Sequence, residues 1–134
     1  MRPWMPLVAA VALTAGCGGA SAPVGSTARA AGFAYTVNAF ACASEICTLD
    51  ITIHNIGRTP RTPGVAFARA YDTGGREYLA DLTLIGLDDP LLSDLAPGAT
   101  IERRLRYRVP ADHTIAKLEL RESPDAEAIS VPLP

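Results

Sequence analysis

The chain has 134 residues, a formal net charge of −2 at pH 7 and a hydrophobic fraction of 49%. A chain of this length fits one domain and is too short for two. Its charges are nearly balanced and include no polybasic block, so the composition predicts no nucleic-acid partner.

The N-terminus predicts an export signal. Arg2 precedes an uncharged run up to Gly16 that is too short to span a bilayer as a mature helix. The run closes on Leu-Thr-Ala-Gly-Cys, which resembles a bacterial lipobox, where the cysteine is lipidated and becomes the mature N-terminus. We therefore predict a lipoprotein signal peptide over residues 1–16, lipidation at Cys17 and a lipid-anchored position on the extracytoplasmic face of the cell membrane. Conventional cleavage is the alternative, because Thr14 stands where lipoboxes usually have Leu.

The next segment predicts a linker. Residues 18–32 consist almost entirely of Gly, Ala, Ser, Pro and Thr, with hardly a side chain large enough to join a core. This composition is typical of a flexible tether. The predicted organisation is a signal peptide at 1–16, a lipidated cysteine with its tether at 17–32, and one folded domain at 33–134.

The folded domain shows an alternation with period two. Apolar and polar residues alternate from Leu49 to Asn55 and again from Ile101 to Val109, where Arg103 is the one charged residue on the apolar side. This pattern indicates half-buried antiparallel strands. Turn signals such as Asn-Ile-Gly at 55–57 and Ala-Pro-Gly at 96–98 separate the strands. The pattern predicts an all-β fold, a single immunoglobulin-like antiparallel β-sandwich of about seven strands. The expected strands are 33–38, 48–55, 65–71, 76–80, 101–109, 115–121 and 128–133.

The order of these motifs resembles a known family. Asn-x-Gly (Asn55, Gly57) is followed by Asp-x-x-Gly-x-x-Tyr (Asp72, Gly75, Tyr78), then Leu-x-Pro-Gly (Leu95, Pro97, Gly98), a strand ending Val-Pro (Val109, Pro110) and a Leu-x-Leu strand (Leu118, Leu120). The order is similar to the telokin-like family of secreted bacterial β-sandwich proteins, over about residues 33–134. The resemblance implies the fold and an extracellular setting, and it carries no catalytic residues.

Two cysteines predict a disulfide. If Cys17 carries lipid, Cys42 and Cys47 remain as an even pair in an oxidising compartment. Four residues separate them, which suits a bond that staples the connection between the first two strands. A redox centre would need Cys-x-x-Cys at a helix start, and neither condition is met.

One strand carries a stripe of positive charge. Arg104, Arg106 and Arg108 occupy alternate positions and share one face of the predicted strand. They are a possible contact for an anionic partner. The structural alternative is a solvated outer face, paired across strands with Glu102, Glu119 or Glu122.

No catalytic constellation is evident. The only histidines are His54 and His113, and no methionine follows Met5. The sequence predicts no catalytic residues, no metal site and no cofactor. We expect a non-enzymatic cell-envelope lipoprotein that binds an envelope protein partner through exposed loops at 56–64 and 81–96. The alternative is a small-ligand or ion-binding lipoprotein that delivers its cargo to a membrane partner.

Overall fold

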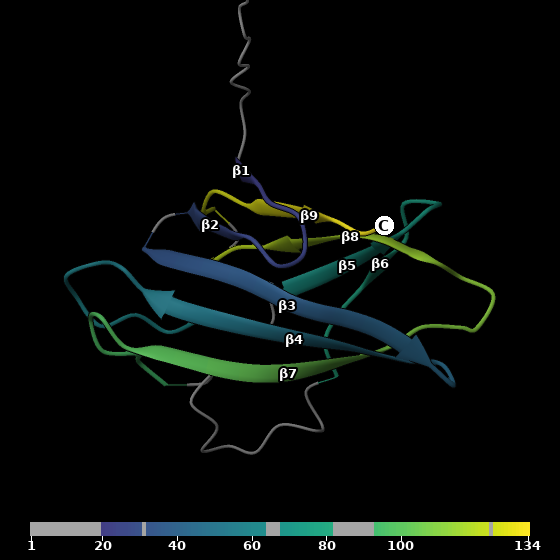
Figure 1. Cartoon of the computed structure of the whole chain (residues 1–134), viewed down its shortest axis with the longest axis horizontal. Coiled ribbons are helices and arrows are strands. Elements are labelled where there is room, and N and C mark those ends of the chain that lie inside the picture. The colour runs from purple at the N-terminus through teal and green to yellow at the C-terminus, as the bar shows by residue number, and fades with distance from the viewer. Residues whose placement is uncertain (1–19, 31, 64–67, 82–92, 124) are drawn as a thin grey trace, which may run out of the picture.

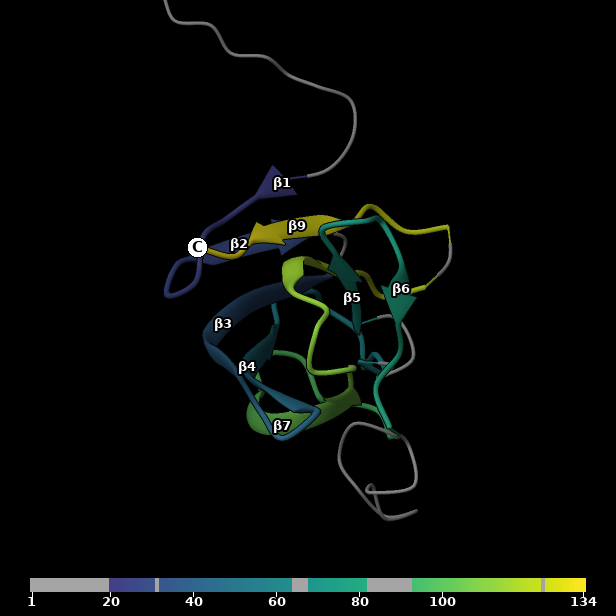
Figure 2. The same ribbon diagram turned by 90° about the vertical axis from the view of Figure 1, so that its right-hand side faces the viewer.

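The computed structural model describes residues 20–30, 32–63, 68–81, 93–123 and 125–134. All strands of these residues lie in two sheets that face each other (Figures 1 and 2). One sheet has the order β1-β9-β8-β5-β6 and the other β2-β3-β4-β7. All pairs are antiparallel except the short parallel contact of β1 with β9. The strands are β1 (Ala20–Ser21), β2 (Thr27–Ala30), β3 (Phe33–Ala43), β4 (Ile46–Asn55), β5 (Ala68–Asp72), β6 (Glu77–Tyr78), β7 (Thr100–Arg108), β8 (Ile115–Leu120) and β9 (Ile129–Pro132). This confirms the predicted all-β sandwich.

The period-two pattern has the expected structural meaning. Along β4, each residue from Cys47 to Asn55 alternates between the buried and the half-buried class. The buried side chains of both sheets meet between them, where removal of apolar surface from water stabilises the fold by about 25 cal/mol per Å². The largest fully buried side chains are Tyr107, Phe33, Leu49, Ile51, Leu118, Leu120, Ile129, Val37, Asn55 and Cys47.

The folded domain begins earlier than the predicted boundary at Phe33. β1 pairs with β9, and β2 pairs along its whole length with β3 from Phe33 to Thr36. Ala22, Ala28 and Ala30 are buried in the core. The predicted tether at 17–32 is therefore wrong from Ala20 onward, because small side chains can fill a site where two backbones approach closely. Cys17 and the predicted signal peptide lie outside the described residues.

Asn55 locks one end of the sandwich. Its fully buried side chain donates through Nδ2 to the carbonyls of Thr59 at 3.0 Å and Leu95 at 2.8 Å, and its Oδ1 accepts the N–H of Gly57 at 2.9 Å. The backbone N–H and C=O of Arg61 also pair with those of Leu95. The described parts of the predicted contact loops, 56–63 and 93–96, are thus tied to each other.

Two buried tyrosines differ in how their hydroxyls are satisfied. Tyr107 on β7 donates to the carbonyl of Ala68 on β5 at 2.7 Å, a hydrogen bond between the two sheets. Tyr35 on β3 is just as buried, but its hydroxyl has no hydrogen-bond partner among the described residues. Burial, with a further contribution from Glu122, raises the pKa of Tyr35 well above its ordinary value.

This difference predicts that replacing Tyr by Phe affects the free energy of unfolding differently at positions 107 and 35. Tyr107→Phe should lower the free energy of unfolding by about 1 kcal/mol, because it leaves the carbonyl of Ala68 without its donor. Tyr35→Phe should leave it unchanged or raise it, since it removes only an unpaired buried hydroxyl. Urea denaturation followed by circular dichroism measures both variants. An equal loss in the two would mean that the hydroxyl of Tyr35 is hydrogen-bonded in solution.

Candidate binding site

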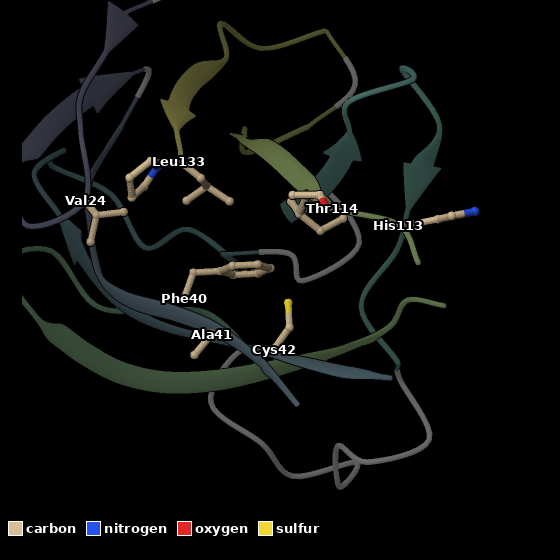
Figure 3. Close-up of a pocket in the computed structure, with 9 residues that line it drawn as sticks. Val24, Phe40, Ala41, Cys42, His113, Thr114 and Leu133 are labelled. Atoms are coloured by element: carbon tan, nitrogen blue, oxygen red, sulfur yellow. The ribbon is translucent and has the colours of Figure 1, made fainter. Parts of the chain in front are cut away.

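A pocket of about 340 Å³ opens between the sheets at the end opposite Asn55 (Figure 3). We call it the hairpin-end pocket, because it lies beside the turn that joins β3 to β4. Figure 3 shows Phe40, Val24 and Leu133 around the hollow, with the sulfur of Cys42 directed into it and His113 pointing away. Its lining residues are Val24, Phe40, Ala41, Cys42, His113, Thr114, Ile115, Leu133 and Pro134.

Phe40 forms one wall of the pocket. A register shift between Val37 and Ala39 interrupts the pairing of β3 with β4 just before it, and such bulges re-aim the following side chains. Its ring packs on Tyr107, with the centroids 6.2 Å apart and a tilted geometry. Phe40 remains half-buried. The opening therefore presents an aromatic face to solvent.

The backbone of β3 beside this pocket has an unpaired side. β2 covers β3 only as far as Thr36, and the N–H of Gly25 bonds the carbonyl of Val37 at 2.7 Å. Beyond this point, residues 38–43 have no strand on that side among the described residues. We call residues 38–43 the open β3 edge.

A disulfide closes the hairpin, as the sequence predicts. Cys42 and Cys47 face each other in the β3–β4 register, and their sulfurs are bonded with the Cα atoms 3.9 Å apart. The connection is a tight turn in which Ser44 and Glu45 have φ values of 53° and 67°. Positive φ at both central residues is the signature of a type I′ turn, which usually contains Asn and Gly. The disulfide thus holds a turn made of less suitable residues.

A hydrogen-bonded chain of Asp72, Tyr78 and His113 supports the neighbouring turns. Tyr78 donates its hydroxyl to Oδ2 of Asp72 at 2.9 Å, and its oxygen lies 2.6 Å from Nδ1 of His113. Because the hydroxyl proton is directed at Asp72, Nδ1 of His113 carries the proton in this contact. His113 is half-buried and is held in place by this contact.

The carboxylate of Asp72 is held ionised by its donors. Its Oδ1 accepts the N–H groups of Gly74 and Arg76, each at 2.9 Å. The N–H of Arg76, then the hydroxyl of Tyr78 and the N–H of Gly74, hold the pKa of Asp72 below its ordinary value. This accounts for the Asp-x-x-Gly-x-x-Tyr motif, in which Gly75 supplies a φ of 86° for the turn.

The lowered pKa of Asp72 predicts how stability changes with pH. A depressed pKa in the folded state stabilises the protein above the unfolded-state pKa of about 4, and the contribution is lost as the pH falls through the folded-state pKa. The difference in unfolding free energy between the wild type and Asp72→Asn should therefore be largest at neutral pH and shrink below about pH 4. Urea denaturation between pH 7 and pH 3 measures it. The exposed Asp125→Asn is the matched control, and a constant difference for Asp72→Asn would contradict the prediction.

The structure places the three predicted contact arginines on one exposed face of β7. Two of them meet carboxylates: Nε of Arg108 lies 3.0 Å from Oδ2 of Asp81, and Nε of Arg104 lies 3.8 Å from Asp50. The predicted partners Glu119 and Glu122 lie on or just after β8 in the other sheet, where Glu119 contacts Lys117 and Glu122 contacts Arg61. Arg106 has no side-chain partner among the described residues. The positive stripe is thus neutralised at two of its three positions.

The described residues contain no group of three or more His, Cys, Asp and Glu side chains placed to hold a metal ion. Within the same residues, no helix has the length and hydropathy that would be needed to cross a membrane. The arrangement around the hairpin-end pocket can bind apolar groups and offer backbone hydrogen bonds.

Sequence reasoning missed the pocket residues Val24, Phe40 and Leu133. They come from the turn after β1, the end of β3 and the segment after β9. A large aromatic residue within the alanine-rich run 39–43 was the one available signal at Phe40. Val24 and Leu133 lie in Pro-containing segments without periodicity, so only the fold brings them together.

Comparison with known proteins identifies the class and then the family. The sandwich is similar to a crystal structure of the yjhA protein from Bacillus subtilis, with a TM-score of 0.63 and 16% identity over 86% of this chain and 99% of that one. It is also similar to MPT63, a secreted protein from Mycobacterium tuberculosis, with a TM-score of 0.65 and 12% identity over 85% and 97%. A β-sandwich protein from Clostridium difficile gives a TM-score of 0.55 and 14% identity over 91% and 99%.

The sequence itself gives the family. Residues 22–129 match the model of a domain of unknown function, DUF4352, and the chain belongs to this family. The match begins at Ala22, before the predicted boundary at Phe33, in agreement with the burial of that residue. A comparison with curated protein sequences found no match.

Proposed function

We propose that this protein is a non-enzymatic cell-envelope lipoprotein that binds another envelope protein at the outer face of a bacterial membrane. Residues 1–16 would be its signal peptide and Cys17 its lipidated N-terminus. The motif order that resembles telokin-like exported proteins supports the extracellular setting. The observation that carries the proposal is the exposed hairpin-end pocket beside the open β3 edge, at the end of β9 opposite the end that pairs with β1.

The position of Ala20 indicates how a lipid-anchored sandwich would be oriented relative to the membrane. Ala20 pairs with Ile129 at the start of β9, whereas Leu133, beyond the other end of β9, lines the pocket. Figure 1 shows the chain entering the sandwich at β1, away from the C-terminus. Three residue steps separate Cys17 from Ala20, a reach of about 10 Å. A lipid on Cys17 would then hold the start of β9 near the membrane and leave the pocket directed away from it.

In-cell crosslinking of the full-length protein, followed by mass spectrometry, tests the proposal. The wild type should yield one dominant envelope protein, and Cys17→Ala should yield less of it because the untethered domain is no longer concentrated at the membrane. Incorporation of labelled palmitate into the wild type but not into Cys17→Ala tests the lipid separately. The absence of any partner above background would overturn the binding role.

The pocket also favours the second candidate, a carrier of a small ligand. Its volume of about 340 Å³ and its apolar lining suit a small apolar molecule. Native mass spectrometry of protein purified from its host checks this. A stoichiometric bound molecule that is lost in Phe40→Ala would favour a carrier, whereas ligand-free protein would leave the protein-binding role ahead. Reproducible substrate turnover by the purified protein would contradict both candidates.

A further inference from the structure

From the geometry of the open β3 edge we infer the form of the partner: an extended peptide segment that adds as a strand to β3 and places an apolar side chain in the hairpin-end pocket. The inference rests on the proposed protein-binding function and deepens it. Strand addition takes its affinity from backbone hydrogen bonds and its specificity from pockets for alternate side chains. Residues 38–43 offer the backbone groups, and the hairpin-end pocket lies directly beside them.

The backbone groups for such a strand are in place. In an antiparallel hairpin, directly opposed residues alternate between hydrogen-bonded and non-hydrogen-bonded pairs, and the latter have the closer Cα atoms. The short Cα separation of Cys42 and Cys47, 3.9 Å, marks a non-hydrogen-bonded pair. The pair of Phe40 with Leu49, two residues along, is of the same kind. The N–H and C=O groups of Phe40 and Cys42 therefore point away from β4, and on that side they form no backbone hydrogen bond with a described residue.

The other outer strands are protected against such pairing. β1 and β6 are two residues long, and β2 is four residues long and carries Arg29. β7 carries the three arginines, and its Arg106 carbonyl accepts the N–H of Asp81 at 2.7 Å. Short strands and charged side chains are the usual means by which proteins block addition at a sheet edge. The open β3 edge has the sequence Asn-Ala-Phe-Ala-Cys-Ala, without a charge or a proline.

Charge distinguishes a foreign peptide from a second copy of this chain. Glu45 lies at the tip of the hairpin, and Asp112, whose side chain is 85% exposed, lies in the turn that carries His113. Arg108 lies on β7 opposite Ile46, at the start of β4, and its charge is paired with Asp81. A second copy would bring the same carboxylates to the edge. A peptide with Lys or Arg next to its apolar residue would complement them.

The short length of the open β3 edge also favours an extended peptide over a second copy of this chain. Residues 38–43 extend over about 20 Å, and β2 occupies β3 before them. An interface this narrow offers little of the roughly 1,200 Å² that a stable protein dimer buries. A single extended segment needs no more than this length.

The test is a selection of random linear peptides, displayed on phage, against the full-length protein purified in detergent. Enriched peptides should share an apolar residue beside a basic one. Val24→Lys places a charge at the rim of the pocket, where a lysine can extend its ammonium into water, and should weaken a synthetic selected peptide about tenfold. Ile56→Lys makes the same kind of change at the opposite end, in the contact loop 56–64 expected from the sequence, which this inference leaves outside the peptide site. It should leave the affinity for the selected peptide unchanged. Circular dichroism verifies that both variants are folded.

A scan of N-methyl groups along the selected peptide tests strand addition without altering the protein. Methylation should weaken binding about fivefold at every second residue and have little effect at those between. Peptides that bind wild type and Val24→Lys equally, a lack of alternation, or no enrichment would each overturn the inference. Self-association through residues 38–43, detected by sedimentation, would assign the edge to a second copy and also overturn it.

A photo-crosslinking residue placed at Ala41 or at Arg104 in the cell separates this inference from the proposed function. A partner captured from position 41 but not from position 104 supports both. A partner captured only from position 104 would be consistent with the protein-binding role but would contradict strand addition at the open β3 edge.

Discussion

Replacing Asn55 with Ala should lower the free energy of unfolding by about 3 kcal/mol or more. The change leaves the carbonyl of Thr59 and the N–H of Gly57 without a partner and removes one of the two donors to the carbonyl of Leu95, which keeps the N–H of Arg61. Each buried group left unsatisfied costs about 1–3 kcal/mol. The loops at 56–63 and 93–99 should loosen together, because Asn55 bonds to both. Urea denaturation followed by circular dichroism gives the loss of stability, and amide hydrogen exchange shows where the structure opens.

Asn38 provides the matched control. It lies on β3 with an exposed side chain that donates to Thr52 at 2.8 Å, and the same change to Ala there should cost less than about 1 kcal/mol. Asn55→Asp is a sharper test of the donor role. It preserves an acceptor for Gly57 but turns a carboxylate oxygen towards two carbonyls. Its destabilisation should be relieved as the pH is lowered, since a protonated carboxyl group can again donate. Equal losses at positions 55 and 38 would contradict the role given to Asn55.

Removing the disulfide by the double change Cys42→Ala, Cys47→Ala should lower the free energy of unfolding by about 2 kcal/mol, the value expected from chain entropy for a loop this short. Because the bond closes the β3–β4 hairpin, the loss should be accompanied by faster hydrogen exchange at residues 40–49. The same preparation tests the binding site, since Cys42 lines the hairpin-end pocket.

A compensating change in the turn shows whether the disulfide acts by holding the hairpin. Ser44→Asn with Glu45→Gly introduces residues that readily adopt positive φ, and should restore about 1 kcal/mol to the disulfide-free protein. Glu45→Gly also removes a carboxylate near the open β3 edge, which by itself could change the affinity for a basic peptide. Peptide binding is therefore compared between the wild type and the single variant Ser44→Asn, which keeps Glu45. A failure of the double turn variant to recover any stability would indicate that the disulfide acts elsewhere than at the turn.

The sequence predicted the strands from β3 to β9 because their signal is local. Leu49, Ile51 and Ile53 alternate with polar residues along β4, and this pattern needs no knowledge of what covers the apolar face. β1 and β2 escaped prediction since the buried residues of this segment, Ala22, Ala28 and Ala30, are alanines, which give almost no hydrophobic signal against a background of Gly, Ser and Pro.

The sequence motifs predicted turns, but they did not predict the hydrogen bonds that their side chains form with distant parts of the chain. Asn-x-Gly at 55–57 predicts a turn from local geometry. The hydrogen bond from Asn55 to Leu95 joins residues that are 40 apart in sequence, and no local pattern specifies it. In the same way, Asp72 and Tyr78 form a recognisable turn motif, whereas the contact of Tyr78 with His113 depends on the pairing of β5 with β8.

By itself, the sequence determined the all-β class and the alternation of buried and exposed faces, because residue spacing along a strand fixes both. It also predicted the disulfide, because Cys42 and Cys47 are a close pair of cysteines in sequence. Only the tertiary structure decided where the sandwich begins, which carboxylates meet the arginines of β7, and where a partner can bind. Those features depend on which strands lie side by side. The hairpin-end pocket joins segments near positions 24, 40, 114 and 133, and the open β3 edge exists because β2 ends before β3 does.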